Sequence, residues 1–346
     1  MLIVRAPLRI SFAGGGTDLP GYYERHGGLV VSTAIDRYVY ATIEVHNDAE
    51  VQIKSSDYRT FYQHEGGRPL NWQGELALPK AIVHHFGIVR GVKLFLASEV
   101  PPGTGLGSSS ALTVALVKGL ATLLGRRLTA SDVASTACFI ELDKLAMPIG
   151  RQDQYASAFG GLNAITFEPS GVQVESVAAS AGAIRELESR LLLFFTHSSH
   201  NSSDILASQS AQSSSSGGQV VESLHAIKQL AHEARRALES GDVDALGDLL
   251  HASWQRKKQL AAGVTNEQID DCYAAAREAG ALGGKITGAG GGGFLMLLAK
   301  HGCQGAIVQA LQERGLYNME FRFEASGAQI LMNSGLDIGP ELLSAA

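Results

Sequence analysis

The residues from Gly103 to Ser110, GTGLGSSS, are of the types that bind phosphate. Three glycines let the backbone approach a ligand closely, and three serine hydroxyls add hydrogen-bond donors. The stretch follows the apolar run VKLFLASEV and precedes LTVALVKGL, so we expect it to join a strand to a helix. The free N–H groups and the positive dipole end of that helix would attract an anion. The alternative is a serine-capped helix start that binds no ligand.

The stretch differs from the two common nucleotide-binding motifs. It contains no GxxxxGK[ST], so it is not a Walker loop, and its GxGxG spacing is not the dinucleotide-binding GxGxxG. Because it lacks a lysine, we expect Mg²⁺, the helix dipole and side chains elsewhere to neutralise the phosphates. The expected nucleotide-binding residues are Pro102, Gly103, Thr104, Gly105, Leu106, Gly107, Ser108, Ser109 and Ser110.

Three carboxylates could serve magnesium-dependent phosphoryl transfer. Asp153 lies among glycines and polar residues in GRQDQYASAFGG, and Glu141 and Asp143 stand about twelve residues earlier on an expected helix. This reaction needs one carboxylate to hold the metal and one near the attacking hydroxyl. Taken singly, each acid could equally be a solvated surface group. The sequence leaves open whether Glu141 or Asp143 is the metal ligand.

The N-terminal stretch RAPLRISFAGGGTDLPGYY combines cations, a glycine turn and groups that can bind hydroxyls. Arg9 precedes the turn, and Thr17 and Asp18 follow three glycines. Threonine and aspartate beside exposed backbone would form a surface that recognises a sugar. Alternatively, Asp18 is the N-cap of a helix that begins at LPGYYERHG.

A third glycine cluster, GAGGGG at 288–293, leads into the apolar run FLMLL. It contains a formal GxGxxG, but a dinucleotide-binding loop would lead into a helix. We expect instead a loop between two strands that packs closely against another phosphate-binding loop, the alternative being a plain hairpin. The chain has 40 glycines, and their clustering at 14–17, 103–107 and 288–293 predicts three loops around one anionic ligand set.

Composition excludes several classes of protein. The 346 residues carry a net charge of −6 without a run of Lys or Arg, which argues against nucleic-acid binding. Three widely spaced cysteines favour a reduced, cytoplasmic protein over a zinc site or disulfide framework. Arg5 interrupts the N-terminal apolar run, and no apolar stretch reaches about 18 residues, so we expect neither a signal peptide nor a membrane span.

The elements that must position these residues are strands and helices mixed without a regular βαβ repeat, which indicates the α+β class. We expect β-structure over the first 60 residues, helices at 78–87 and from Thr129 to about Leu145, a strand at 92–100, and irregular structure around Asp153. Helices follow a low-complexity segment at 208–219, and a capping-box match at Thr265 opens one of them. Strands at MEFRFEAS and AQILM come after these helices. The pattern of polar and apolar residues changes near residue 170, and we divide the chain into domains at 1–180 and 181–346.

Three motifs in order give the chain a resemblance to the GHMP kinases, a family that includes galactokinase, homoserine kinase and mevalonate kinase. They are APLRISFAGGGTD at 6–18, PPGTGLGSSSA at 101–111 and KITGAGGGGF at 285–294. The resemblance covers nearly the whole chain. It implies an N-terminal domain like ribosomal protein S5 domain 2 and a ferredoxin-like C-terminal domain, with the active site between them.

The resemblance also implies residue roles. Asp153 falls on the family's catalytic aspartate and Arg9 on the basic residue that accompanies it, while Ser108 and Glu141 fall on the magnesium ligands. The glutamate and histidine of the galactokinase first motif are Gly15 and Gly16 here. The expected substrate-binding residues are Gly14, Gly15, Gly16, Thr17, Asp18, Arg151, Gln152 and Gly290.

Within the family the motifs resemble those of bacterial heptose kinases, which implies ATP and Mg²⁺ as cofactors and a sugar phosphate as substrate. The expected reaction phosphorylates the anomeric (C1) hydroxyl of D-glycero-D-manno-heptose 7-phosphate, for nucleotide-activated heptose and surface polysaccharide. A kinase of free fucose or galactose is the alternative. The expected cations for the substrate phosphate are Arg5, Arg37, Lys54 or Arg151, and His197, His200 and Asn201 replace an arginine that relatives carry near serines. The chain could also form a homodimer.

Overall fold

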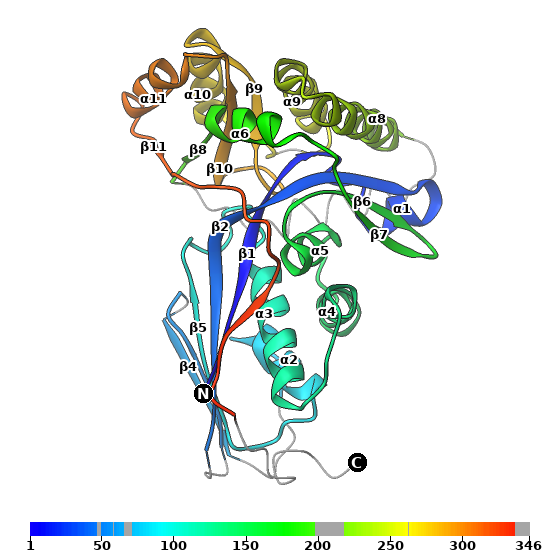
Figure 1. Ribbon diagram of the computed structural model, residues 1–346, viewed down its shortest axis with the longest axis vertical. Helices are drawn as coiled ribbons and strands as arrows, with labels where there is room; N and C mark the ends of the chain where they lie inside the picture. Colours follow the sequence, from blue (N-terminus) through cyan, green and yellow to red (C-terminus); the bar gives the residue numbers. More distant parts are fainter. Residues whose placement is uncertain (47–49, 58, 66–70, 198–217, 262, 336–346) are drawn as a thin grey trace.

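The computed structural model describes residues 1–46, 50–57, 59–65, 71–197, 218–261 and 263–335. In this part of the chain the strands form an eight-stranded and a four-stranded sheet (Figure 1). The larger sheet has the order β12-β1-β2-β5-β3-β4, and β6 and β7 branch from β2. Its strands are β1 (Leu2–Ala13), β2 (Gly28–Val45), β3 (Glu50–Ser55), β4 (Thr60–Glu65), β5 (Val92–Ser98), β6 (Leu162–Glu168), β7 (Gly171–Ser176) and β12 (Gln329–Asn333).

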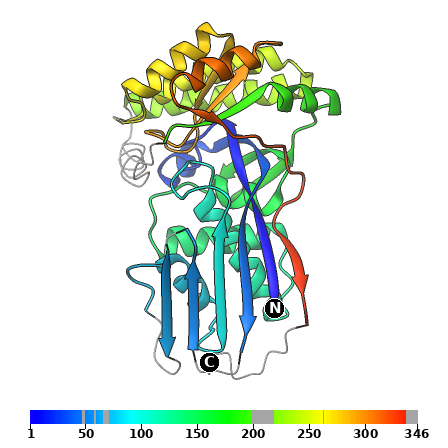
Figure 2. The same cartoon turned by 90° about the vertical axis from the view of Figure 1, so that its left-hand side faces the viewer.

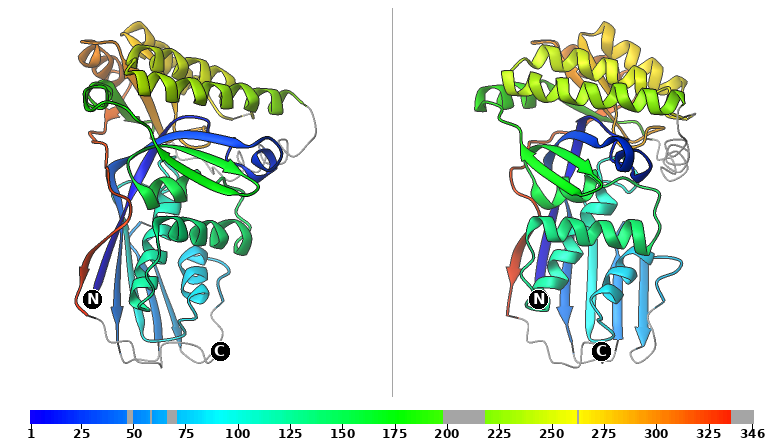
Figure 3. Two further views of the ribbon diagram at one scale, coloured as in Figure 1. Left: turned by 45° about the vertical axis from the view of Figure 1, so that its right-hand side comes forward. Right: turned by 90° about the vertical axis from the view of Figure 1, so that its right-hand side faces the viewer.

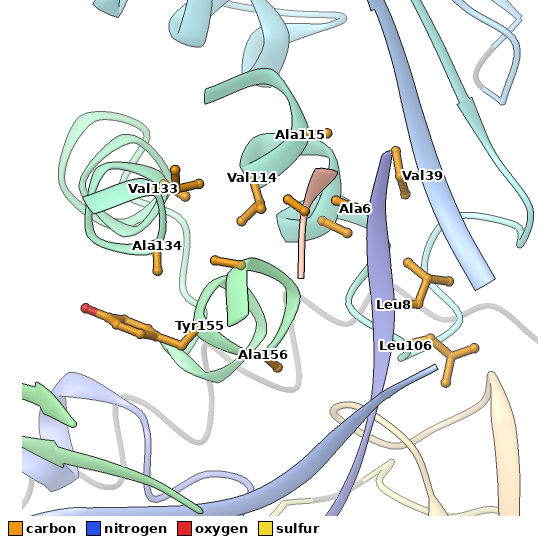
Figure 4. Packing of buried hydrophobic residues seen from close by; sticks show 14 of the residues in the cluster. Ala6, Leu8, Val39, Leu106, Val114, Ala115, Val133, Ala134, Tyr155 and Ala156 are labelled. Atoms are coloured by element: carbon orange, nitrogen blue, oxygen red, sulfur yellow. The ribbon is translucent and has the colours of Figure 1, made fainter. Parts of the chain in front are cut away.

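Helices cover one face of this sheet. In Figure 2 no helix lies in front of β3, β4 and β5 on the other face, while α8 (Gln219–Ser240) packs on β1 and β2 at the upper end. The covering elements are α2 (Ala77–His85), α3 (Ser108–Leu123), α4 (Ala130–Cys138), the π-helix η1 (Phe139–Lys144) and α5 (Gln152–Phe159), while α1 (Pro20–His26) lies near β6. Figure 4 shows Val114 of α3 beside Ala6 of β1, and Val133 of α4 and Tyr155 of α5 belong to the same core cluster. Burial of these apolar side chains fixes the helices on the sheet.

The smaller sheet has the order β11-β8-β10-β9 and is antiparallel. Leu191 and Leu193 pack into the core shared with the larger sheet, whereas Leu192 and Phe194 belong to a second core. Burial on both faces explains the continuous apolar runs LLLFF and FLMLLA. The strands are β8 (Leu191–Phe195), β9 (Ala281–Ile286), β10 (Phe294–Ala299) and β11 (Tyr317–Asn318), and the helices are α6 (Ala181–Arg190), α8 (Gln219–Ser240), α9 (Val243–Lys257), α10 (Glu267–Glu278) and α11 (Gln304–Gln312). The long helices α8 and α9 run side by side in both views of Figure 3.

Several predicted element boundaries are confirmed. The helix predicted at 78–87 is α2, and α4 begins with a capping box in which Thr129 and Asp132 bond each other's backbone N–H. The helix expected after the capping-box match at Thr265 is α10, but its N-cap is Asn266, whose side chain accepts from the Ile269 N–H, while the Thr265 hydroxyl donates to Asp270. The low-complexity segment lies almost wholly outside the described residues.

Two predictions of local structure are wrong. The segment around Asp153 is the helix α5, whose small side chains allow close packing on α3 and α4; Ser157 also bonds the Pro7 carbonyl oxygen at 2.8 Å. The strand predicted at MEFRFEAS is absent apart from a single bridge between Phe323 and Ile35, because this segment crosses between the sheets. The strand predicted at AQILM forms β12, which pairs with β1 of the larger sheet. The division at residue 180 falls between β7 and α6 and stays a prediction.

The second and third glycine clusters lie backbone to backbone. A β-carbon at Gly288 would stand 2.5 Å from the Gly105 Cα, and one at Gly293 would stand 2.3 Å from the Thr104 carbonyl oxygen. The Thr287 hydroxyl donates to that same oxygen at 3.2 Å. Side chains here would force the loops apart, so the expected close packing of these two loops is confirmed.

This contact makes a prediction for stability. Gly293 (φ +91°) and Gly302 (φ +80°) share the left-handed conformation, but nothing lies within 4 Å of a β-carbon at Gly302. Gly302→Ala therefore measures the conformational cost alone, about 1 kcal/mol. Gly293→Ala should lower the free energy of urea unfolding by at least about 2 kcal/mol more, because it also displaces the facing backbone. Equal losses in the two variants would contradict the contact.

Candidate active site

Arg9 connects β1, α5 and the glycine loop. Its Nε donates to Asp153 Oδ1 at 2.7 Å and a second guanidinium nitrogen lies 2.6 Å from the same oxygen, while Nη1 donates to the Gly105 carbonyl oxygen at 2.6 Å. Its backbone N–H donates to the Leu106 carbonyl oxygen at 3.1 Å. Arg9 is 4% exposed, so water does not compete strongly for these bonds. The predicted catalytic pair is therefore in contact.

The glycine loop leads directly into α3. Gly103, Gly105 and Gly107 have φ of 75°, 77° and 78°, a conformation that favours glycine. The fully buried Leu106 anchors the loop in the core and lies close to Leu8 in Figure 4. Thr104 is also fully buried and bonds the Pro101 carbonyl oxygen at 2.9 Å. These two side chains face inward, so the loop offers its backbone and the serines of α3 to a ligand.

A pocket of about 170 Å³ joins the three glycine clusters. Of the predicted site residues, it is lined by Arg9, Gly15, Gly16, Asp18, Gly103, Gly105, Gly107, Ser108, Ser109, Ser110, Gln152 and Asp153. A second pocket of about 490 Å³ shares Ser108, Ser109 and Met147 with it and is also lined by Pro102 and apolar residues of α2 and β5. The start of α3 therefore stands between a compact polar pocket and a larger, more apolar one.

Some predicted site residues lie away from these pockets. The Thr17 hydroxyl is fully buried, accepts from the Leu29 N–H at 3.0 Å and lies 2.8 Å from the Gly14 carbonyl oxygen, which holds the turn together. The Arg151 guanidinium stacks over the Tyr23 ring at 5.2 Å, and Gly290 packs against Val264. The residues outside both linings are Gly14, Thr17, Thr104, Leu106, Glu141, Arg151 and Gly290.

Asp18 is held at the pocket wall by backbone and amide donors. Its carboxylate accepts from the Gly16 N–H at 2.9 Å and from the Gln152 N–H and side-chain amide at 3.2 and 3.1 Å. Burial, and then the nearby negative charge of Asp153, raise its pKa. The N-cap alternative for Asp18 is wrong, since Leu19 is the N-cap of α1 and that helix has no side-chain cap.

Glu141 is fully buried behind the start of α3. Its two oxygens accept hydrogen bonds from Ser110 at 2.9 Å, from Thr113 at 2.6 Å and from the Gln154 amide. Burial raises its pKa to about 7, although these hydrogen bonds act in the opposite direction. Asp143, the alternative metal ligand, is exposed on the same π-helix. Among the described residues no three His, Cys, Asp or Glu side chains gather as a metal cluster.

Two lysines that the sequence analysis did not single out stand beside the pocket. Lys257, at the last turn of α9, lines it and donates to the carbonyl oxygens of Ile286, at 3.1 Å, and of Gly288. Burial and the Arg9 charge lower its pKa to about 7. Lys285, on β9, is 5% exposed. Its position directly before ITGAGGGG is the one sequence signal that could have indicated it.

The cations predicted for a substrate phosphate lie elsewhere. Arg5 bonds Gln329 and stacks on Tyr38, Arg37 bonds Asp36 and the Glu320 carbonyl, and Lys54 stands 5.5 Å from the Phe61 ring. None of them lines either pocket. The ring of His197 contacts Phe195 and Tyr317, and His200 and Asn201 lie outside the described residues.

Comparisons with known proteins assign the family. A model described as GHMP kinases N terminal domain matches residues 76–161, and one described as GHMP kinases C terminal matches residues 234–315. The chain is 32% identical, over 94% of its length and 97% of the other's, to D-glycero-alpha-D-manno-heptose 7-phosphate kinase of Campylobacter jejuni. The chain belongs to the GHMP kinase family, which confirms the predicted α+β, two-domain fold.

Two further relatives bear on the substrate. A crystal structure of a D-glycero-D-manno-heptose 1-phosphate kinase from Bacteroides thetaiotaomicron is 29% identical, with a TM-score of 0.79 and coverage of 97% of this chain and 100% of that one. A bifunctional fucokinase/GDP-fucose pyrophosphorylase of Arabidopsis thaliana is 27% identical over 86% of this chain but only 30% of its own length.

In the described part of the chain, no helix has the length and apolar character needed to span a bilayer.

The buried carboxylate predicts a pH dependence. The pKa of Glu141 is about 7 when folded against 4.5 ordinarily, so the folded protein keeps the proton where the unfolded chain releases it. The wild type should thus lose stability from Glu141 as pH rises from about 4.5 to about 7. The Glu141→Gln variant has a side chain that cannot ionise, so it should not show this loss. In metal-free buffer, its free energy of urea unfolding should therefore increase relative to that of wild type by about 2–3 kcal/mol between pH 5 and pH 8. A pH-independent difference would place the pKa of Glu141 in its ordinary range.

Proposed function

We propose that the protein is an ATP-dependent kinase that phosphorylates the anomeric hydroxyl of D-glycero-D-manno-heptose 7-phosphate. The observation that carries the proposal is the Arg9–Asp153 pair, set in one pocket with the glycine loop and the start of α3. A carboxylate beside a phosphate-binding loop can place an acceptor hydroxyl in line with a transferable phosphoryl group. The family and the heptose kinase relatives support the same reaction.

The nucleotide is proposed to occupy the two connected pockets. Its phosphates would meet the backbone of 103–107 and the N–H groups at the start of α3, where the helix dipole favours negative charge. The larger, more apolar pocket, which shares Ser108 and Ser109, suits the base and ribose in size and lining. Inward-facing Leu106 holds the loop rigid, so its amides need little reorganisation when the phosphates bind.

The residues near the start of α3 fit a magnesium ion. Ser108 and Asp153 face the pocket, and Glu141 stands behind Ser110, so the available donors are the hard oxygens that Mg²⁺ prefers. Of the two expected ligands, Ser108 would hold the ion from the pocket, whereas Glu141 would act on it through Ser110, which lies between that carboxylate and the pocket. When bound, the ion supplies positive charge that bridges and neutralises the phosphates.

Asp153 is proposed to orient the acceptor hydroxyl and take its proton. Arg9 fixes the Asp153 carboxylate through Oδ1, which leaves Oδ2 for the hydroxyl. Asp18 and Gln152, which line the same pocket, would bind further sugar hydroxyls. Because phosphoryl transfer proceeds through a loose transition state, positioning is the larger share of this contribution.

The identity of the sugar is the finer part of the proposal. One heptose kinase relative is named for a heptose 7-phosphate and the other for a heptose 1-phosphate, so their names differ over the phosphorylated position. The fucokinase relative makes a kinase of a free sugar the second candidate. The polar wall of Asp18 and Gln152 is less suited to an isoprenoid or amino-acid substrate. The Arg9–Asp153 pair argues against a catalytically silent nucleotide-binding regulator. We place the reaction in the cytoplasm, where ATP is supplied.

Asp153→Asn tests the catalytic role. The amide keeps the size of the side chain but accepts a proton poorly, so kcat should fall by roughly 10²- to 10⁴-fold while ATP affinity changes little. The matched control is Asp143→Asn, the same change at an exposed carboxylate, which should leave kcat near wild type. Both are measured by ADP release and by calorimetric binding of a non-hydrolysable ATP analogue. Near-normal turnover in Asp153→Asn would remove Asp153 from the mechanism.

A substrate panel tests the sugar. ADP release is compared for D-glycero-D-manno-heptose 7-phosphate, the unphosphorylated heptose, L-fucose and D-galactose, and the product is located by phosphorus–proton NMR. We expect the largest kcat/KM for the heptose 7-phosphate and a 1,7-bisphosphate product. A larger kcat/KM for fucose or galactose would overturn the heptose assignment and leave the kinase assignment intact.

A further inference from the structure

Three cationic side chains meet behind the reaction pocket. Arg9 comes from β1, Lys257 from the end of α9 and Lys285 from β9. Burial and mutual repulsion lower the pKa of both lysines, with Arg9 contributing to each shift. The Asp153 carboxylate is paired with Arg9. Within the described residues, the Lys285 ammonium group makes no hydrogen bond or ion pair.

A small cavity of about 20 Å³ lies among these cations. It shares Arg9, Gly15, Gln152, Lys257 and Gly288 with the 170 Å³ pocket, so it continues that pocket inward. Its remaining lining is Ser11, Ile227, Ser253 and Lys285. The volume is enough for one water molecule or for one phosphate oxygen that enters from the larger pocket.

Two polar atoms at this cavity lack partners. Ser11 is 6% exposed and its hydroxyl has no hydrogen-bond partner among the described residues; the same holds for Oε1 of Gln152. Buried polar groups are normally hydrogen-bonded, and an unpaired hydroxyl beside the unpaired Lys285 ammonium group indicates a missing acceptor, whereas Gln152 Oε1, itself an acceptor, needs a donor such as a substrate hydroxyl. Positive charge without a counter-charge is also costly to bury. An anion at this point would accept from the Ser11 hydroxyl and balance the charge of the Lys285 ammonium group.

We propose that Lys257, Lys285 and Ser11 form the subsite for the phosphate group that the acceptor sugar carries. The inference rests on the proposed function, because it names the part of the sugar phosphate that this end of the site binds. Two of the Lys257 donors are used by backbone carbonyls, and an ammonium group has a third. A phosphate centred where the pockets join reaches this donor and places one oxygen in the small cavity, toward Lys285 and Ser11.

The lining assigns this subsite to the acceptor and not to ATP. Gly15 and Gln152, which belong to the acceptor side, line the small cavity, whereas no residue of 103–110 does. The subsite also replaces the arginines expected from sequence: Arg5, Arg37 and Arg151 are all engaged outside the pocket. Phosphate recognition here uses cations from β9 and α9.

The test is Lys285→Met, which keeps an unbranched side chain and removes the charge. The KM for the heptose 7-phosphate should rise by roughly 10- to 100-fold, the loss of one charge-assisted hydrogen bond, while the KM for ATP and for the unphosphorylated heptose stay near wild type. The matched control is Lys258→Met, which lies next to Lys257 but pairs with Asp270 and lines neither pocket. An increase in the KM for ATP alone, or equal increases for both sugars, would overturn the proposal.

Binding of inorganic phosphate separates this inference from the proposed reaction. Calorimetric titration with the non-hydrolysable ATP analogue present should give at least tenfold weaker phosphate binding to Lys285→Met than to wild type and Lys258→Met. That result supports the subsite even if the heptose 7-phosphate is not a substrate, whereas equal affinities would overturn the subsite and leave the kinase assignment intact. If Lys285→Met does not fold, judged by its thermal unfolding, Ser11→Ala takes its place, with a smaller expected loss of phosphate affinity.

Discussion

The geometry of the site depends on the guanidinium of Arg9. This group is planar and its donors point in fixed directions, so two acceptors bonded to it take defined positions relative to each other. Here the acceptors are Asp153, at the start of α5, and the Gly105 carbonyl of the loop before α3. Because Arg9 is a residue of β1 and pairs with Ala34 of β2, both segments are held in place relative to the larger sheet. Close approach of the third glycine cluster then adds the smaller sheet to this arrangement.

Electrostatics and packing act against each other in this region. Asp18 and Asp153 are close enough for one charge to raise the pKa of the other carboxyl, and Glu141 is buried where a charge is costly. On the opposite side, Arg9, Lys257 and Lys285 repel one another. An anionic ligand can relieve the repulsion among the cations, whereas the repulsion among the carboxylates is relieved by a proton or a metal cation. This balance suits a protein whose proposed substrates are both phosphorylated.

The sequence was most informative where chemistry requires particular residue types at short spacing. The glycine loop, the serines of α3 and the Arg9–Asp153 pair could be predicted because a phosphate site at a helix start leaves a local signature and the family motif supplies its partner. Lys257 could not be predicted, since it is an ordinary lysine at the end of a helix that tertiary packing brings to Arg9. Lys285 had one sequence signal, its position at the start of KITGAGGGGF, but nothing in the sequence indicates that it meets Arg9. Thr17 and Arg151 show the converse: their residue types suit a ligand, but the structure has their polar groups in contact with other parts of the fold.

The return of the chain to its first sheet has a mechanical consequence. The smaller sheet and its helices are connected to the larger sheet twice, through the segment before α6 and through the segment that runs from β11 to β12 beside β1 (Figure 1). A body on one connection can swing and twist about it, whereas two separated connections leave mainly rotation about the line that joins them. Packing of Leu191 and Leu193 into the core of the larger sheet opposes this remaining rotation, so Lys257 and Lys285 keep their positions beside Arg9.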